Sequence, residues 1–249
     1  MRLFGLIGYP LGHSFSKKYF SEKFEREDIE DARYELFPIP AIGDITEIIR
    51  QHPELCGLNV TIPYKESVIP FLDELDETAR EVGAVNCIRT RQGRLTGFNT
   101  DVYGFEQSLR NAWNDSWPTG TQALILGTGG ASKAVAYVLK KMGIGCTFVS
   151  RKPEPGHLSY EDLKYLDWSD YRLVVNTTPL GTFPRTEEYP DVPFGEFSPR
   201  LLVFDLVYNP PQTVLLRRAM EQGALVRNGL EMLELQAEKA WEIWQQEHS

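Results

Sequence analysis

The fold class of this chain is decided by the stretch Gln122-Ala123-Leu124-Ile125-Leu126-Gly127-Thr128-Gly129-Gly130-Ala131-Ser132. An apolar run ends in a glycine-rich turn, and a helical pattern that closes at Gly143 begins directly after it. Glycine lets backbone amides approach a phosphate, and the helix N-terminus supplies free N–H groups and a positive dipole end. The stretch therefore predicts a cofactor site formed by Gly127, Gly129, Gly130 and Ala131. The third small residue is Ser132 or Ala131, an imperfect match to G-x-G-x-x-G/A, so a turn that binds nothing remains the alternative.

The next predicted strand, Cys146–Ser150, ends in two cations and carries no carboxylate there. In NAD-specific folds an acidic residue at this point bonds the ribose 2′-hydroxyl, whereas an arginine can pair with a 2′-phosphate. We therefore predict that Ser150, Arg151 and Lys152 bind NADP in preference to NAD. A solvated basic turn is the alternative.

Outward from this unit, apolar strands alternate with helical patterns along the chain. The predicted strands are 3–7, 34–37, 55–60, 122–126, 146–150, 173–176, 201–206 and 224–227, and residues 85–89 and 94–97 form a hairpin around Gln92-Gly93. The predicted helices are 16–26, 42–50, 67–72, 76–82, 101–113, 131–142, 212–222 and 230–246. This alternation favours an α/β architecture with parallel sheets covered on both faces. The apolar face of 230–246 is too broad for a free tail, so this helix must pack on the protein.

The composition limits the classes of partner. A chain of 249 residues suits two domains, and 26 Lys and Arg against 35 Asp and Glu give a net charge of −9. Because such a field repels polyanions, we expect binding neither to nucleic acid nor to anionic membranes. A small anion can still bind where a few positive groups or N–H donors are gathered locally.

The cysteines and the N-terminus indicate the compartment. Cys56, Cys87 and Cys146 are odd in number and form no C-x-x-C pair, so we expect reduced thiols, no disulfide framework and no metal site. The apolar run Leu3–Ile7 is too short for a signal peptide or a membrane span. We expect a soluble cytoplasmic protein that acts on a small molecule as a monomer or homodimer.

Four polar clusters stand where predicted strands end, which is where open α/β sheets place their ligands. They are Gly8–Ser16, Gly57–Lys65, Gly83–Asn86 and Gly97–Asp101. Each has an ordinary structural reading, such as a helix cap at Ser14 or Ser16, turn chemistry at Thr61, or a strand-end amide at Asn86. Together, the small hydroxyl and amide groups describe a site for a polyhydroxylated ligand better than four coincidences.

The chain resembles the shikimate dehydrogenase family from Ile7 to Gln236. The matching blocks are Ile7-Gly8-x-Pro10-x-x-His13-Ser14-x-Ser16, Asn59-Val60-Thr61-x-Pro63-x-Lys65, Gly83-Ala84-Val85-Asn86, Asn99-Thr100-Asp101, Gly127-x-Gly129-Gly130-Ala131, Asn176-Thr177-Thr178-Pro179-x-Gly181, Asp205-x-x-Tyr208-x-Pro210 and Asn228-Gly229-x-x-Met232-Leu233-x-x-Gln236. So many blocks in this order make the resemblance highly specific.

The resemblance implies the NADP-dependent interconversion of shikimate and 3-dehydroshikimate, with Lys65 as the catalytic proton donor and acceptor. Asp101 would favour the ammonium form of Lys65 if it lies beside it. The implied substrate ligands are Ser14 and Ser16 for the carboxylate, and Asn59, Thr61, Asn86, Asp101, Tyr208 and Gln236. The resemblance adds Thr177, Val207 and Gly229 to the cofactor site.

The resemblance also implies a domain plan. Residues 1–100 and 229–249 would form an N-terminal α/β substrate domain that the C-terminal helix completes. Residues 101–228 would form a Rossmann-like dinucleotide-binding domain with a parallel sheet, and a cleft would lie between the two domains.

Some positions depart from the family pattern. Tyr19-Phe20 replaces a His-Asn pair on the helix behind the site, and Cys87 stands where threonine is common. Glu154 occupies a position where many members carry a second arginine, which leaves open a quinate/shikimate dehydrogenase that uses NAD or NADP. A non-catalytic shikimate-binding regulator is the alternative from another class. It is disfavoured because a binding module needs no proton donor such as Lys65.

Overall fold

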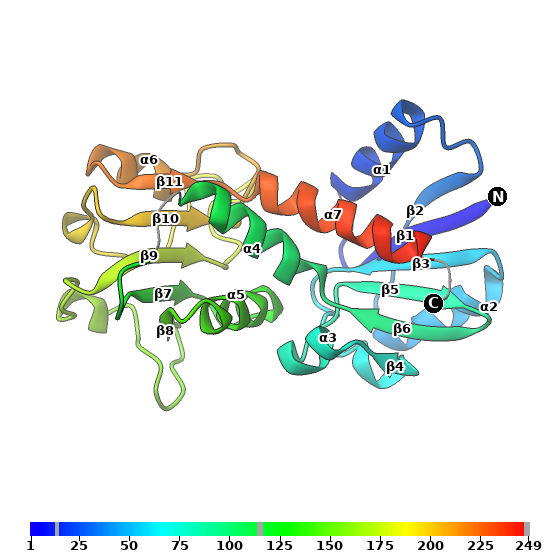
Figure 1. Cartoon of the computed structure of the whole chain (residues 1–249), viewed down its shortest axis with the longest axis horizontal. Coiled ribbons are helices and arrows are strands. Elements are labelled where there is room, and N and C mark those ends of the chain that lie inside the picture. Colours follow the sequence, from blue (N-terminus) through cyan, green and yellow to red (C-terminus); the bar gives the residue numbers. More distant parts are fainter. Residues whose placement is uncertain (13–14, 114–116, 247–249) are drawn as a thin grey trace. The chain divides into compact units, whose positions relative to one another are not determined.

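The computed structural model describes residues 1–12, 15–113 and 117–246. The chain forms two compact units, each built around its own sheet (Figure 1). Unit 1 comprises Met1–Thr100 and Gln236–Ser249, and unit 2 comprises Asp101–Leu235. The chain thus passes back into unit 1 within its last helix, α7 (Leu230–Gln245), at Gln236 rather than at residue 229.

The sheet of unit 1 has six strands. Their order is β2 (Ala32–Pro38), β1 (Arg2–Gly8), β3 (Leu55–Val60), β5 (Cys87–Arg91), β6 (Arg94–Phe98) and β4 (Glu74–Leu75). β1 is parallel to β2 and β3, but β5 is antiparallel to β3 and β6. The chain turns from β5 into β6 in the predicted hairpin, where Gln92 and Gly93 both have positive φ, as a two-residue turn requires. Unit 1 therefore holds a mixed sheet and not a purely parallel one.

The helices of unit 1 are α1 (Phe15–Arg26), α2 (Ile45–Gln51) and α3 (Glu77–Val82), with short 3-10 turns at Ile42–Asp44 and Ile69–Phe71. The helix predicted over 67–72 is only the second of these turns, because Pro70 has no N–H to continue a helix.

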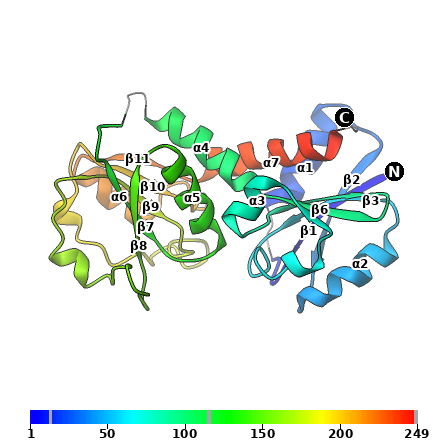
Figure 2. The ribbon, with the colours of Figure 1, turned by 60° about the horizontal axis from the view of Figure 1, so that its bottom comes forward.

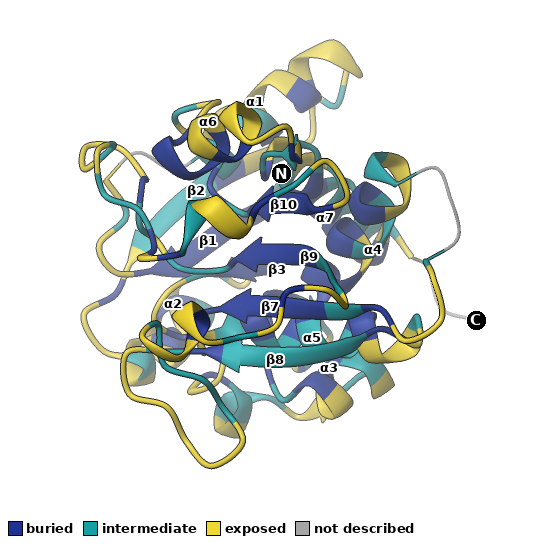
Figure 3. Ribbon diagram, turned by 90° about the vertical axis from the view of Figure 1, so that its left-hand side faces the viewer, coloured by how far each residue is buried: buried dark blue, intermediate teal, exposed yellow. Residues whose placement is uncertain are grey.

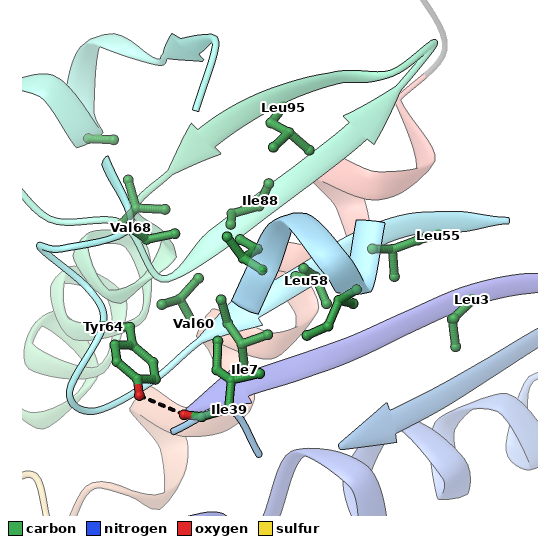
Figure 4. Packing of buried hydrophobic residues seen from close by; sticks show 14 residues of the cluster. Leu3, Ile7, Ile39, Leu55, Leu58, Val60, Tyr64, Val68, Ile88 and Leu95 are labelled. Atoms are coloured by element: carbon green, nitrogen blue, oxygen red, sulfur yellow. Dashed lines mark hydrogen bonds between the residues drawn. The ribbon is translucent and has the colours of Figure 1, made fainter. Parts of the chain in front are cut away.

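The two faces of the unit 1 sheet bury separate cores. Leu3 and Ile7 of β1 belong to the core that contains residues of α2, and Figure 4 shows Leu3 near Leu55 and Ile7 near Val60 of β3. Phe4 belongs to an aromatic core on the opposite face, together with residues of α1 and of the C-terminal part of α7. This core accounts for the broad apolar face predicted for the last helix.

The sheet of unit 2 has five strands, all parallel. Their order is β11 (Leu225–Arg227), β10 (Leu202–Asp205), β9 (Tyr171–Asn176), β7 (Gln122–Leu126) and β8 (Gly145–Val149). β7, β9 and β10 are mostly buried, as the dark blue strands in Figure 3 show, while β8 at the edge is half-buried. Apolar runs on central strands are typical of a parallel sheet covered on both faces.

Helices cover both faces of this sheet. α6 (Val214–Glu221) shares a core with Val203 of β10, whereas Phe105 of α4 (Thr100–Ala112) packs edge-on against Phe204 at 5.2 Å. Consecutive strand residues point to opposite faces, so α4 and α6 lie on opposite sides of the sheet. α5 (Gly130–Lys141) follows β7 and packs along β7 and β8 (Figure 2). Short 3-10 turns at Asp162–Lys164 and Phe194–Glu196 complete unit 2.

Candidate active site

The glycine-rich turn joins β7 to α5 as predicted. Gly127 has a φ of 103°, and a Cβ there would lie 2.9 Å from Thr177 Oγ1, so only glycine suits this position. Gly129 is the N-cap of α5; it is exposed, and a Cβ there would meet nothing within 4 Å. The exposed N-terminus of a helix can receive a phosphate group.

The structure brings Thr177 to this turn although it is distant in sequence. Thr177 lies just after β9, and its N–H and Oγ1 both donate to the Leu126 carbonyl, at 2.9 and 2.7 Å. β8 lies on one side of β7 and β9 on the other, so the strand order reverses here. Open α/β sheets bind ligands at such a switch point. Gly127 and Thr177, two predicted cofactor residues, thus meet at the expected place.

The basic turn after β8 belongs to the same sheet edge. Gly127 N–H donates to the Val149 carbonyl at 2.8 Å, which joins the ends of β7 and β8. Ser150 Oγ accepts a hydrogen bond of 3.0 Å from Lys152 N–H, and Arg151 and Lys152 are exposed. The donor set of this edge, with amides at one end and a guanidinium at the other, fits a nucleotide that carries a 2′-phosphate.

A buried carboxylate fixes the ends of β9 and β10. Asp205 is fully buried and accepts hydrogen bonds from Asn176 Nδ2 at 2.8 Å, Thr213 Oγ1 at 2.6 Å and Val207 N–H at 3.0 Å. Val207 in turn accepts from Gly229 N–H at 3.1 Å, and a Cβ at Gly229 would lie 2.0 Å from the Leu206 carbonyl. Val207 and Gly229 belong to the predicted cofactor site, but Asp205 has no predicted role, because burial of a carboxylate cannot be inferred from a single Asp.

Burial raises the pKa of the Asp205 carboxyl to about 6 from 3.8, and the three hydrogen bonds oppose this only in part. The folded chain therefore holds this proton more tightly than the unfolded chain, so the contribution of Asp205 to the free energy of unfolding falls as the pH rises from about 4 to about 6.

Asp205→Asn removes the titration of this carboxyl. We expect the stability of the variant relative to wild type to improve by about 2 kcal/mol between about pH 4.5 and about pH 8. Urea unfolding of both proteins at both pH values measures this change. A stability difference between variant and wild type that does not depend on pH would contradict the titration assigned to Asp205.

Unit 1 gathers three of the predicted substrate residues into one hydrogen-bonded group. Asn86 Nδ2 donates to Thr100 Oγ1 at 2.9 Å and to Gln236 Oε1 at 3.4 Å, while Asn86 Oδ1 accepts from Thr100 N–H at 2.6 Å. Asn59 Nδ2 donates to the Asn86 carbonyl at 3.4 Å. All four side chains are buried. Thr100 is therefore part of this group, although it has no predicted role beyond its place in the motif Asn99-Thr100-Asp101.

The turn that follows β3 carries the predicted catalytic lysine. Thr61 N–H donates to the Ile7 carbonyl at 3.0 Å, and the Lys65 carbonyl accepts from Val85 N–H at 2.7 Å. The buried Tyr64 hydroxyl donates to the Ile39 carbonyl at 2.6 Å (Figure 4). Both ends of the turn are therefore held by backbone hydrogen bonds, and Lys65 itself is half-buried.

The other predicted substrate residues are divided between the units. Ser16 is half-buried in the first turn of α1 in unit 1, whereas Ser14 lies outside the described residues. Asp101 is buried in the first turn of α4 and is the first residue of unit 2. Tyr208 follows β10 in unit 2, where burial raises the pKa of its hydroxyl.

Two departures from the family pattern have a packing role. Phe20 stacks on Tyr34 with ring centroids 4.6 Å apart, and Cys87 is buried in the same aromatic core. Desolvation raises the pKa of the Cys87 thiol, which suits an inert core residue.

Comparisons with known proteins agree with this geometry. Residues 6–88 match the model of the shikimate dehydrogenase substrate binding domain. The chain is 36% identical to the NADP(+) shikimate dehydrogenase of Desulforamulus reducens over 96% of its own length and 88% of the relative's. The chain belongs to the shikimate dehydrogenase family.

Solved structures of the family extend the likeness to three dimensions. Shikimate 5-dehydrogenase from Thermus thermophilus, in complex with NADP(H) and shikimate, has a TM-score of 0.83 and 32% identity, with 98% of this chain and 94% of that chain covered. The enzyme from Listeria monocytogenes, in complex with shikimate and NAD, has a TM-score of 0.84 and 30% identity, with coverages of 98% and 90%. The N-terminal substrate domain and the Rossmann-like domain predicted from the sequence are the domains of these relatives.

The described residues contain no group of three or more His, Cys, Asp or Glu placed to hold a metal ion. No helix among them is long and apolar enough to cross a membrane.

Proposed function

We propose that this chain catalyses the reversible NADP-dependent reduction of 3-dehydroshikimate to shikimate, the shikimate dehydrogenase step of aromatic amino-acid biosynthesis. The observation that carries the proposal is the buried group in unit 1 that contains the side-chain amides of Asn59, Asn86 and Gln236. It occurs in a chain that is 36% identical to an NADP(+) shikimate dehydrogenase over nearly its full length. Buried amides can bind a ring with several hydroxyls, because each offers both donors and acceptors.

The proposed roles follow from chemistry and position. NADPH, when bound, supplies the hydride that reduces the carbonyl carbon. Lys65 donates a proton to the carbonyl oxygen as it becomes a hydroxyl, and accepts it in the reverse direction. Ser14 and Ser16 bind the substrate carboxylate, while Thr61, Asp101 and Tyr208 join the three amides around the ring. Aligning these groups before reaction removes part of the entropic barrier.

The proposed cofactor site is the edge of the unit 2 sheet. Gly127, Gly129, Gly130 and Ala131 would receive the pyrophosphate at the N-terminus of α5, and Ser150, Arg151 and Lys152 would receive the 2′-phosphate. Val207, Gly229 and Thr177 would line the same edge near the nicotinamide. We propose a cytoplasmic enzyme, since its three cysteines are free thiols, and a monomer or homodimer.

The proposal is tested by oxidation of shikimate and of quinate by the full chain, each with NADP and with NAD. We expect the highest kcat/KM for shikimate with NADP. Comparable rates with quinate or NAD would favour the quinate/shikimate dehydrogenase alternative. Two observations are consistent with that alternative: Glu154 in this chain and the NAD complex of the Listeria relative. Binding of shikimate without turnover on any combination would favour the regulator.

A further inference from the structure

Tyr34 is a buried residue of β2 that no polar motif marks. Its side chain is 3% exposed and lies in the aromatic core of unit 1, where its ring stacks on Phe20. A buried tyrosine hydroxyl needs hydrogen-bond partners, because leaving it without them costs free energy. The partner that the Tyr34 hydroxyl finds here is a side chain of the proposed substrate site.

This partner is Asn59. The Tyr34 hydroxyl donates to Asn59 Oδ1 at 2.7 Å, and both groups are buried. This bond fixes which end of the amide is the oxygen, so Asn59 Nδ2 is directed to the side where it reaches the Asn86 carbonyl at 3.4 Å. That bond is near the long limit for an N–H donor, and an amide nitrogen has two protons. Asn59 Nδ2 therefore retains capacity to donate to a ligand hydroxyl.

Burial raises the pKa of the Tyr34 hydroxyl well above its ordinary value, and the Ser16 side chain opposes this rise only in part. The net rise keeps the hydroxyl protonated over the ordinary pH range, so Tyr34 remains a donor to Asn59. Asn59 in turn hydrogen-bonds Asn86, and Asn86 hydrogen-bonds Thr100 and Gln236. Hydrogen bonds therefore connect Tyr34 with residues from four other parts of unit 1.

We propose that Tyr34 is a positioning residue for the substrate: its hydroxyl holds Asn59 in the orientation that receives a ring hydroxyl of the ligand. This inference rests on the proposed function, since it assigns a role relative to that ligand. Tyr34 acts through Asn59, because its own hydroxyl is buried in the aromatic core.

Tyr34→Phe removes the hydroxyl and keeps the ring that packs on Phe20. We expect the KM for shikimate to rise about fivefold to tenfold, the order of the loss of one well-formed neutral hydrogen bond, with kcat changed by less than about threefold. The KM for NADP should not change. Initial rates of shikimate oxidation measure all three quantities, and thermal unfolding monitors the fold.

A matched control and a mutant cycle separate positioning from general loosening. Tyr171→Phe makes the same chemical change in a half-buried tyrosine of unit 2, at the first residue of β9 and so at the strand end opposite the proposed cofactor site, and should leave the KM for shikimate unchanged. If Tyr34 acts through Asn59, adding Tyr34→Phe to Asn59→Ala should raise KM much less than it does in the wild type.

The outcomes are distinct. A wild-type enzyme that oxidises shikimate, combined with an unchanged KM in Tyr34→Phe, would overturn the positioning role and leave the proposed function intact. Independent, multiplicative effects of Tyr34→Phe and Asn59→Ala, or an equal KM rise in Tyr171→Phe, would also overturn it. A wild-type protein with no shikimate activity would refute the proposed function, and the role assigned to Tyr34 with it.

Discussion

Replacing Lys65 with alanine is expected to lower kcat for shikimate oxidation by about 10²–10⁴, the usual contribution of a positioned general acid or base. The reason is that hydride transfer changes the charge on the substrate oxygen, and alanine offers no group to exchange a proton with it. The KM for shikimate should change far less, because the hydroxyl and amide groups that bind the ring remain. Steady-state rates at saturating NADP measure both constants.

A control separates the loss of this proton donor from the loss of a charge. Lys140→Ala removes an exposed lysine from the last turn of α5 and should keep kcat within about twofold of wild type. Lys65→Arg keeps the positive charge, but arginine does not release its proton in proteins, so this variant should remain strongly impaired. A near-normal kcat in Lys65→Ala would remove Lys65 from the proton-transfer step.

Arg151→Ala is expected to raise the KM for NADP by about tenfold to a hundredfold and to leave the use of NAD nearly unchanged. Hydrogen bonds to charged groups contribute about 1.5–3 kcal/mol, and a 2′-phosphate can accept two of them from one guanidinium. NAD has no phosphate at that position and loses nothing. Kinetics with both cofactors on the same preparation provide the measurement.

Lys152→Ala is the matched comparison, because Lys152 is the adjacent exposed cation of the same turn. We expect it to raise the KM for NADP less than Arg151→Ala does, since an ammonium is a point charge without the bidentate geometry. Equal losses with NADP and NAD in Arg151→Ala would instead mean that Arg151 supports the fold of the turn.

The elements with strong local signals could be predicted from the sequence. The β7–turn–α5 segment and the β5–β6 hairpin carry glycines where the backbone needs positive φ, and both occur as predicted. The short strand β4 was not predicted, because two residues are too few for a periodic pattern. The strand β2 was predicted over 34–37 only, although pairing with β1 extends it from Ala32 to Pro38.

The candidate site could be predicted where polar residues cluster in sequence. The glycine-rich turn predicts Gly127, the family resemblance implies Thr177, and the sheet brings the two together. Tyr34 and Asp205 could not be chosen in the same way. Each lies in or at the end of an apolar strand, and its importance arises from partners far away in the sequence, Asn59 for Tyr34 and Asn176 for Asp205. Such contacts exist only once the sheet has formed.

The central claim is that this chain reduces 3-dehydroshikimate with NADPH. Loss of absorbance at the NADPH band, followed after addition of 3-dehydroshikimate to the wild-type chain and to Lys65→Ala, tests it most directly. The expected result is a rapid decrease that depends on the substrate in the wild type and a rate lower by about 10²–10⁴ in the variant. No decrease that depends on 3-dehydroshikimate in the wild type would contradict the claim.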